Sequence, residues 1–231
     1  MIADKLLQLH ERLARACTAA ARPVQSVTLL VVSKTFGPRA VREAFQAGEH
    51  RFGENYVQEG VDKIGALADV RSQIEWHLIG PLQSNKTRVV AEQFDWVHSV
   101  DRLKIAQRLS EQRPVHRPPL QVCLQVNISG EPSKSGLRPS EVPAVAHAVA
   151  ALPRLALRGL MAIPEPAADF SAQRVPHHAL HALLQSLNAA GLALDTLSMG
   201  MSADLEAAIA EGATMVRVGS AIFGARPALS S

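Results

Sequence analysis

Short apolar runs and helical stripes of apolar residues alternate along the chain. The first run, residues 27–34, is almost wholly apolar until it reaches Ser33 and Lys34, which is typical of a strand with apolar neighbours on both faces. Similar runs follow at residues 50–52, 74–80, 94–100, 120–128, 155–162, 195–199 and 214–219. The pattern therefore predicts a strand at each of these places.

Between the strands, apolar residues recur every three or four positions, as they do on one face of a helix. Leu6, Leu9 and Leu13 have this spacing before the first strand, so an additional N-terminal helix is expected over residues 3–21. Strands that alternate with helices pair in parallel through helical crossovers. The pattern favours a single (β/α)8 TIM barrel domain over residues 1–231, and the lack of a GxGxxG motif speaks against a dinucleotide-binding sheet. Helices are expected near residues 41–48, 55–67, 83–92, 103–109, 142–149, 180–187 and 202–210, with a last one from residue 220.

The composition limits which partners and which cellular compartment are expected for this chain. The net charge is +3 and no long block of Lys or Arg interleaves with aromatic residues, so nucleic acid is not expected as a partner. Cys17 and Cys123 lie far apart, which indicates buried thiols in a reducing compartment, with neither a disulfide nor a metal site. No apolar run approaches the roughly 20 residues of a membrane span. We therefore expect a soluble, cytoplasmic protein without a membrane segment.

In a barrel of this kind, chemistry is expected at the carboxyl ends of the strands. Lys34 stands out there, because a Lys in a dry wall or a cavity loses its proton more easily and becomes a nucleophile. The alternative is a Lys that has left the strand and meets water. The other residues that the predicted strand ends and following loops bring to this face are Asn55, His77, Asn127, Met161, Met201, Ser202, Arg217, Gly219 and Ser220.

Ser202 and Ser220 each stand where a helix is expected to begin, in the loops after the last two strands. Barrels often bind phosphate in these two loops. Two helix N-termini with hydroxyl groups form an anion site without a Lys, whereas each Ser by itself is explained by helix capping. Gly219 adds a position at which the backbone approaches a ligand closely.

Arg217 interrupts an apolar strand. Its side chain takes the opposite face to Val216 and Val218, so it enters the barrel interior if those valines face the helices. A buried guanidinium needs partners. The ring nitrogen of a phosphate-bearing cofactor is one possible partner, and barrel carboxylates such as Glu54 or Asp204 are the alternative.

Several strings of the sequence match one known family. They are VSKT (32–35), RFGENYVQE (51–59), WHLIGPLQSNK (76–86), SKSG (133–136), RGLMAIP (158–164), SMGMSAD (198–204) and VRVGSAIFG (216–224). With these strings in the same order over about residues 27–226, the chain resembles the pyridoxal phosphate homeostasis proteins (YggS/PROSC type). The resemblance implies a barrel like the N-terminal domain of alanine racemase, with pyridoxal 5′-phosphate (PLP) bound as an internal aldimine.

The resemblance also implies a role for individual residues. Carried over by position, Lys34 is the Schiff-base lysine and Arg217 faces the pyridine nitrogen. Many relatives have Thr in place of Ser220, and the hydroxyl group is kept. The residues implied to complete the cofactor site are Ser202, Gly219 and Ser220 around the phosphate, and Asn55, His77 and Met201 beside the cofactor.

The function implied by this site is to hold PLP and hand it over. An Arg beside the pyridine nitrogen donates a hydrogen bond without protonating the ring, which weakens the electron sink that carbanion chemistry needs. We therefore expect a protein of intracellular PLP (vitamin B6) homeostasis without catalytic turnover. Its expected partners are PLP and PLP-requiring apoenzymes, and its expected state is a monomer.

Two enzymatic alternatives remain. A PLP-dependent amino-acid racemase of the alanine racemase type needs a proton acceptor on each face of its substrate, and Lys34 supplies only one. Tyr56, the only Tyr, is explained by packing, so His77 or a water molecule would have to act as the second base. A Schiff-base aldolase barrel without PLP explains Lys34 but not an Arg217 inside the barrel. Lys134, in a Ser/Lys/Gly loop, is either a solvated lysine or a second lysine near the barrel mouth.

Overall fold

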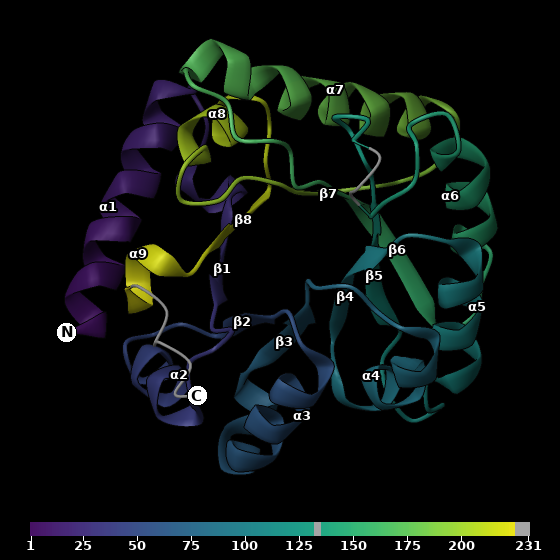
Figure 1. Cartoon of the computed structure of the whole chain (residues 1–231), viewed down its shortest axis with the longest axis horizontal. Helices are drawn as coiled ribbons and strands as arrows, with labels where there is room; N and C mark the ends of the chain where they lie inside the picture. The colour runs from purple at the N-terminus through teal and green to yellow at the C-terminus, as the bar shows by residue number, and fades with distance from the viewer. Residues whose placement is uncertain (132–134, 225–231) are drawn as a thin grey trace.

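The computed structural model describes residues 1–131 and 135–224 of the 231-residue chain. Its parallel strands form a closed barrel in the order β1-β2-β3-β4-β5-β6-β7-β8, and β1 also pairs with β8 (Figure 1). The predicted (β/α)8 TIM barrel with an additional N-terminal helix is thereby confirmed. The strands are β1 (Thr28–Val32), β2 (Arg51–Glu54), β3 (Glu75–Leu78), β4 (Trp96–Val100), β5 (Leu120–Gln125), β6 (Leu155–Met161), β7 (Thr196–Ser198) and β8 (Met215–Val218).

Helices surround the barrel (Figure 1). Within the described residues, none of them is both long and apolar enough to cross a bilayer. The α-helices are α1 (Ile2–Ala19), α2 (Pro38–Gln46), α3 (Val57–Ala66), α4 (Thr87–Gln93), α5 (Leu103–Gln112), α6 (Val142–Ala150), α7 (Phe170–Ala189), α8 (Leu205–Ala210) and α9 (Ser220–Phe223). Short 3-10 helices are η1 (Val24–Ser26), η2 (Ala68–Gln73) and η3 (Ser84–Lys86).

Several helices begin at other places than the sequence pattern predicts: α2 begins at Pro38 and not at residue 41, and α4 at Thr87 and not at residue 83. α7 begins at Phe170 and not near residue 180, because the Asp169 side chain accepts a hydrogen bond from the backbone N–H of Ala172 at 2.8 Å and caps the helix. α8 begins at Leu205 and not at Ser202. The start of α8 changes the role of Ser202 in the site described below.

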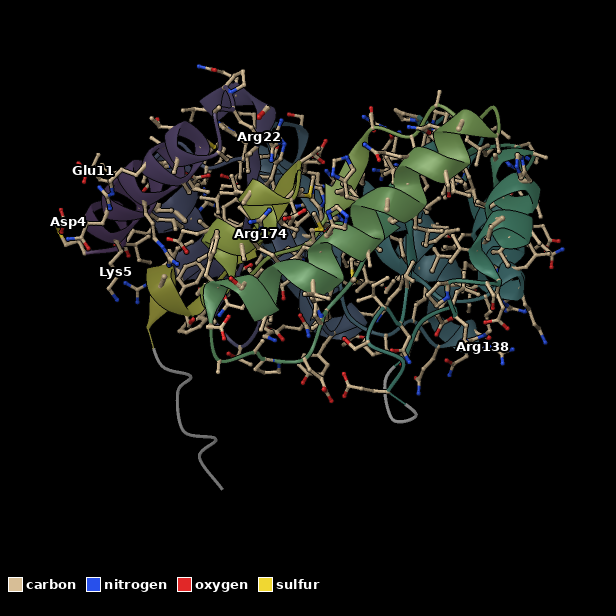
Figure 2. The ribbon with its side chains drawn as sticks, turned by 90° about the horizontal axis from the view of Figure 1, so that it is seen from above. Asp4, Lys5, Glu11, Arg22, Arg138 and Arg174 are labelled. Carbon is tan, nitrogen blue, oxygen red and sulfur yellow. The ribbon has the colours of Figure 1, made fainter. Side chains whose placement is uncertain are left out.

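α1 covers the outside of the barrel where the last strand meets the first, beside α2, α8 and α9 (Figure 1). Its buried face carries Leu6 and Leu13, while Asp4 and Glu11 point into solvent (Figure 2). The amphipathic spacing of the sequence thus explains why this additional helix packs against the barrel.

Arg12 of α1 ties the N-terminal helix to the segment around α8. Its Nε donates to Glu206 Oε1 at 2.6 Å, and its Nη2 donates to the backbone carbonyl of Ser202 at 2.9 Å. The two partners lie more than 180 residues further along the chain. The first helix therefore supports a loop that the last part of the sequence forms.

The side chains of the strands divide into two layers. One face packs against the helices in the main apolar core, to which Val216 and Val218 belong. The opposite face points into the barrel, because successive residues of a strand alternate between faces. There the apolar residues form two small groups: Leu30, Val32, Ile79 and Met215 in one, and Trp96, Cys123 and Met161 in the other. The barrel interior also buries polar groups, among them His77, His98, Ser198 and Arg217.

Candidate functional site

A cavity of about 330 Å³ lies at the carboxyl end of the strands. This is the end at which the fold predicts chemistry. Polar and small residues from four separate parts of the chain meet there. These parts are the segment after β1, the segment after β2, the loop after β7, and β8 with the residues that follow it. Its lining includes Lys34, Thr35, Phe36, Asn55, Ile79, Ile163, Met201, Ser202, Ala203, Arg217, Gly219 and Ser220.

Lys34 lines this cavity from a turn and not from a strand. β1 ends at Val32, two residues earlier than the apolar run predicts, because the chain turns over Ser33 and the Phe36 N–H donates to the Ser33 carbonyl at 3.1 Å. Thr35 in this turn has φ 68°, a left-handed conformation that a β-branched residue rarely adopts. The half-buried Lys34 side chain is thus held at the cavity by a tightly folded turn.

A buried ion cluster fixes this turn from the outer side of the barrel. Lys63 of α3 donates from Nζ to the Ser33 carbonyl, to Glu54 Oε1 and to Glu59 Oε1, each at 2.7 Å. Ser33 Oγ donates to the same Glu54 oxygen at 2.5 Å, and the Thr35 N–H donates to Glu59 Oε1 at 2.5 Å. Burial raises the pKa of Glu54 to about 7, although the attraction of Lys63 opposes this shift.

The sequence analysis did not identify Lys63 as a supporting residue. It lies beside Ile64 on the inward stripe of α3, four positions after Glu59, and only 3% of it is exposed. The i, i+4 pair of Glu59 and Lys63 is the signal that the sequence carries, but such pairs also occur on solvated helix faces.

The loops after β7 and β8 meet at the cavity. Ser202 Oγ and Ser220 Oγ are 3.5 Å apart. Ser220 is the first residue of α9, where the leading backbone N–H groups have no acceptor in an earlier turn. A side chain on Gly219 would place its Cβ 2.7 Å from the Val32 carbonyl oxygen, so only glycine lets these two backbones approach so closely.

Ser202 reaches this place without capping a helix. It lies in a turn before α8, and the predicted helix start at Ser202 is wrong because Asp204 organises the turn. Asp204 accepts from the Met201 N–H at 2.7 Å and pairs with His177 of α7 at 2.9 Å. Burial disfavours the Asp204 carboxylate, but these hydrogen bonds outweigh burial and lower its pKa.

Arg217 enters the barrel interior and reaches the cavity floor. Val216 and Val218 pack against the helices on the opposite face, as the alternation predicts. Arg217 Nη1 donates to the carbonyl and the hydroxyl of Ser198 at 2.5 and 2.8 Å, and Arg217 Nη2 donates to the Ala162 carbonyl at 2.8 Å. Burial lowers the pKa of Arg217 to about 10, which still leaves it charged at neutral pH.

The hydrogen-bond partners of Arg217 in the described part of the chain do not include the barrel carboxylates that the sequence analysis gave as one alternative. Among the described residues, its hydrogen bonds go to carbonyl and hydroxyl oxygens and to no carboxylate. Glu54 points to α3, where Lys63 binds it, and Asp204 binds His177. The guanidinium is therefore fixed in place while its charge has no carboxylate partner in hydrogen-bonding contact.

Asn55 and Met201 complete the wall. Asn55 Oδ1 is buried and has no hydrogen-bond partner among the described residues, so an acceptor at this cavity is left for a ligand or a water molecule. Met201 lines the same cavity and is 39% exposed. Both residues therefore face the cavity at the carboxyl ends of the strands.

His77 and Tyr56 are not part of this wall. The buried His77 ring is stacked on Trp96, with ring centroids 5.3 Å apart, and does not line the cavity. The side chain of His77 points from β3 into the barrel interior. Nearness to a strand end, on which the expectation for His77 rested, does not give this depth. Tyr56 is 61% exposed and lies outside the cavity lining. Lys134 lies outside the described residues.

Asn127 and Met161 do not line the 330 Å³ cavity either. Asn127 closes its own loop, because its side chain donates to the Glu131 carbonyl at 2.7 Å and accepts from the Glu131 N–H at 3.2 Å. It lines a neighbouring cavity of about 260 Å³ that shares Asn55 with the first. Met161 packs inside the barrel against Trp96 and Cys123.

The donor set at the cavity suits a small organic ligand. Within the part of the chain that the structure describes, no three His, Cys, Asp or Glu side chains gather as metal ligands. The cavity instead combines the amine of Lys34 with hydroxyl groups, a guanidinium and an unsatisfied amide oxygen. Such a set matches a ligand with a carbonyl group, an anionic group and a polar ring.

Comparison with known proteins agrees with this geometry. The family model described as "Alanine racemase, N-terminal domain" matches residues 6–227. The pyridoxal phosphate homeostasis protein of Pseudomonas aeruginosa is 60% identical over 225 residues, which cover 97% of this chain and 96% of the relative. The protein of the same name from Escherichia coli K12 is 53% identical over 226 residues, with 97% of each chain covered.

A solved structure supports the same grouping. The structure of PipY from Synechococcus elongatus PCC7942 with PLP bound has a TM-score of 0.85 and 36% sequence identity to this chain. The match covers 97% of this chain and 100% of PipY. The chain therefore belongs to the family of the alanine racemase N-terminal domain, and within it to the pyridoxal phosphate homeostasis proteins.

Proposed function

We propose that this protein binds pyridoxal 5′-phosphate as an internal aldimine on Lys34 and buffers or supplies it within the cell. The observation that carries the proposal is one cavity lined by an amine, a pair of hydroxyl-bearing loops and a buried guanidinium. PipY, 36% identical, has been solved with PLP bound, and the named relatives carry the homeostasis function in their names. PLP-requiring apoenzymes are the partners that such a function implies.

The residues fit the cofactor group by group. Lys34 would supply the amine that forms a C=N bond with the aldehyde, with the release of one water molecule. Ser202 and Ser220 offer hydroxyl groups to the phosphate, together with the leading N–H groups of α9. Gly219 keeps this part of the wall open, since any larger residue collides with the Val32 carbonyl. The unsatisfied Asn55 Oδ1 is left to accept from the ligand or its water.

Arg217 sets what the bound cofactor is suited for. When bound, the cofactor supplies an electrophilic aldehyde and a conjugated ring that accepts electrons. A guanidinium with a pKa of about 10 donates a hydrogen bond to the ring nitrogen and does not give up its proton at neutral pH. The ring therefore stays a weak electron sink, which favours storage and delivery over turnover.

The racemase alternative lacks a second base. Among the described residues that line the cavity, Lys34 is the one side chain able to act as a general base. Tyr56 and His77 do not line the cavity. The geometry thus favours a carrier over an amino-acid racemase.

The first test is the absorbance spectrum of the protein mixed with PLP. We expect a band at about 420 nm from the Schiff base, and borohydride reduction with peptide mapping should leave the label on Lys34. Lys34→Ala should lose the band, while Lys104→Ala on the exposed face of α5 should keep it. A full band in the Lys34 variant contradicts the assignment.

The second test separates a carrier from an enzyme. The PLP-loaded protein is incubated with a panel of L-amino acids, and the D-enantiomers are measured by chiral chromatography. The carrier proposal expects no enantiomer above a no-protein control. Turnover of about 1 s⁻¹ or faster would make the protein a racemase.

A further inference from the structure

A continuous chain of buried hydrogen bonds runs through the barrel from the cavity floor to the opposite mouth. Arg217 donates to Ser198 Oγ at 2.8 Å, and Ser198 Oγ is 2.7 Å from His98 Nδ1. His98 Nε2 is 2.9 Å from His77 Nδ1, and His77 Nε2 is 2.9 Å from Glu75 Oε1. These residues belong to β8, β7, β4 and β3, so the chain crosses the interior from one side of the barrel to the other (Figure 1).

The middle of the chain is closed to solvent. His77, His98 and Ser198 have no exposed surface, and Arg217 is 4% exposed. Glu75 lies at the first residue of β3, where it lines a cavity of about 440 Å³ at the amino ends of the strands. It also accepts from Arg51 Nε at 3.2 Å. Four consecutive hydrogen bonds thus link a cation at one mouth to a carboxylate at the other.

The two ends dictate the direction of every bond between them. Arg217 has donors only, and an ionised Glu75 has acceptors only. Burial disfavours the Glu75 carboxylate, but the hydrogen bond from His77 and the attraction of Arg51 outweigh burial and lower its pKa to about 2. Four bonds need four donors, which Arg217, the Ser198 hydroxyl and two neutral imidazoles supply. Both rings must then carry their proton on Nε2.

The reverse direction leaves one contact without a proton. If His98 carried its proton on Nδ1, His77 would have to donate from Nδ1, and its bare Nε2 would face the Glu75 carboxylate at 2.9 Å. Two acceptors in contact repel each other. A doubly protonated ring is also disfavoured, because burial lowers the pKa of His77 and of His98, the latter well below its usual value of 6.5.

We propose that Ser198 and His98 are positioning residues, which hold the Arg217 guanidinium in one orientation at the cavity floor through a one-way hydrogen-bond chain anchored on Glu75. This inference rests on the proposed function, because the group that Arg217 faces in the cavity is the ring of the proposed cofactor. The backbone carbonyls of Ser198 and Ala162 already hold this guanidinium, and the chain adds a side-chain hydrogen bond that fixes its angle further. It therefore sets how firmly the cofactor ring is held.

The first test examines the chain without cofactor. ¹⁵N NMR of the histidine side chains in the ligand-free protein distinguishes the two neutral tautomers, and the His77→Gln and His98→Gln spectra assign the signals. We expect both rings as the Nε2–H tautomer at neutral pH. An Nδ1–H tautomer or an imidazolium at either position would overturn the one-way chain.

The second test measures binding. Ser198→Ala removes the hydroxyl link, whereas Ser198→Thr keeps it. Ser110→Ala is the matched control, because the buried Ser110 hydroxyl of α5 donates to the Pro153 carbonyl and has no part in the chain. We expect Ser198→Ala to raise the dissociation constant of PLP about tenfold, as the loss of a hydrogen bond to a charged group does. The absorbance band of the bound cofactor should shift in that variant alone.

The outcomes separate positioning from a merely structural role. If Ser198→Ala and Ser110→Ala weaken binding equally, or if neither does, Ser198 does not position Arg217. If Ser198→Thr does not fold, a pair of His98 variants takes its place. His98→Gln retains one donor and one acceptor, whereas His98→Leu has neither. Failure of the wild-type protein to bind PLP would refute the proposed function, and the tautomers then decide on the chain by themselves.

Discussion

Removing Lys63 is the sharpest perturbation of the cavity wall. The Lys63→Met change keeps the length and the apolar part of the side chain and deletes its charge. Three hydrogen bonds of 2.7 Å disappear, one of them to the carbonyl of Ser33 directly before Lys34. The fully buried Glu54 then loses its cationic partner.

The expected cost is large compared with the stability of a typical domain. Breaking a buried ion pair by removing one partner costs about 3–5 kcal/mol, whereas whole domains are stable by about 5–15 kcal/mol. The Glu54→Gln/Lys63→Met double variant also removes the buried carboxyl group that has lost its partner, so we expect it to be more stable than Lys63→Met alone. Lys104→Met on the exposed face of α5 should change stability by less than about 0.5 kcal/mol.

The pH dependence gives a second signature of the same cluster. The folded-state pKa of Glu54 is raised to about 7 from its usual 4.5, so the folded protein binds the extra proton and stability falls as pH rises between these values. Without Lys63, the pKa of Glu54 rises further. The loss of stability in Lys63→Met should therefore continue above pH 7, where the wild-type curve levels off.

Urea unfolding followed by circular dichroism, repeated across pH, checks both statements. The four proteins of the Lys63 and Glu54 cycle give the coupling energy directly. Additive effects within about 0.5 kcal/mol would refute the idea that the two charges depend on each other. A loss below about 1 kcal/mol in Lys63→Met would show that the cluster does not anchor the turn.

Two further changes test other parts of the site. Gly219→Ala should lower the free energy of unfolding by about 1–3 kcal/mol and weaken PLP binding, because its methyl group meets the Val32 carbonyl at 2.7 Å. The control is Gly65→Ala in α3, where a methyl group has open space, and urea unfolding should show it to be neutral or stabilising. Equal effects of the two changes would contradict the argument. Below pH 6.5 the two buried rings should act in the opposite direction to Glu54. Their contribution to stability decreases as pH drops, by at most about 1.4 kcal/mol per pH unit for each ring, because the unfolded chain takes up protons that folded His77 and His98 resist. His98→Gln should flatten this slope, and an unchanged slope would contradict the neutral state of the ring.

The positions of Lys34 and Arg217 follow from the sequence because each depends on a regular pattern. A (β/α)8 barrel brings the carboxyl ends of all strands to one face, so residues far apart in the chain converge without any knowledge of their contacts. The valines that flank Arg217 fix the face on which it lies. The same pattern misplaces His77, because nearness to a strand end does not give depth inside the barrel.

The supporting residues could not be predicted in this way. His98 and Ser198 lie within predicted strands, but their partnership depends on which side chains meet across the barrel, 100 residues apart. The start of α8 depends on Asp204, whose partner His177 belongs to another helix. Such contacts arise from tertiary packing, which overrides local propensity.

The anchoring of the loop before α8 by α1 has a consequence for the order of folding. α8 has six residues and α9 has four, and isolated helices of that length do not persist in water. Both pack on α1, and Arg12 reaches the Ser202 carbonyl across 190 residues of chain. A contact of such sequence separation forms late, after most of the loop-closure entropy has been lost. α1 therefore has its full set of contacts only after β8 has formed, and the loops after β7 and β8 become ordered only when these distant segments meet.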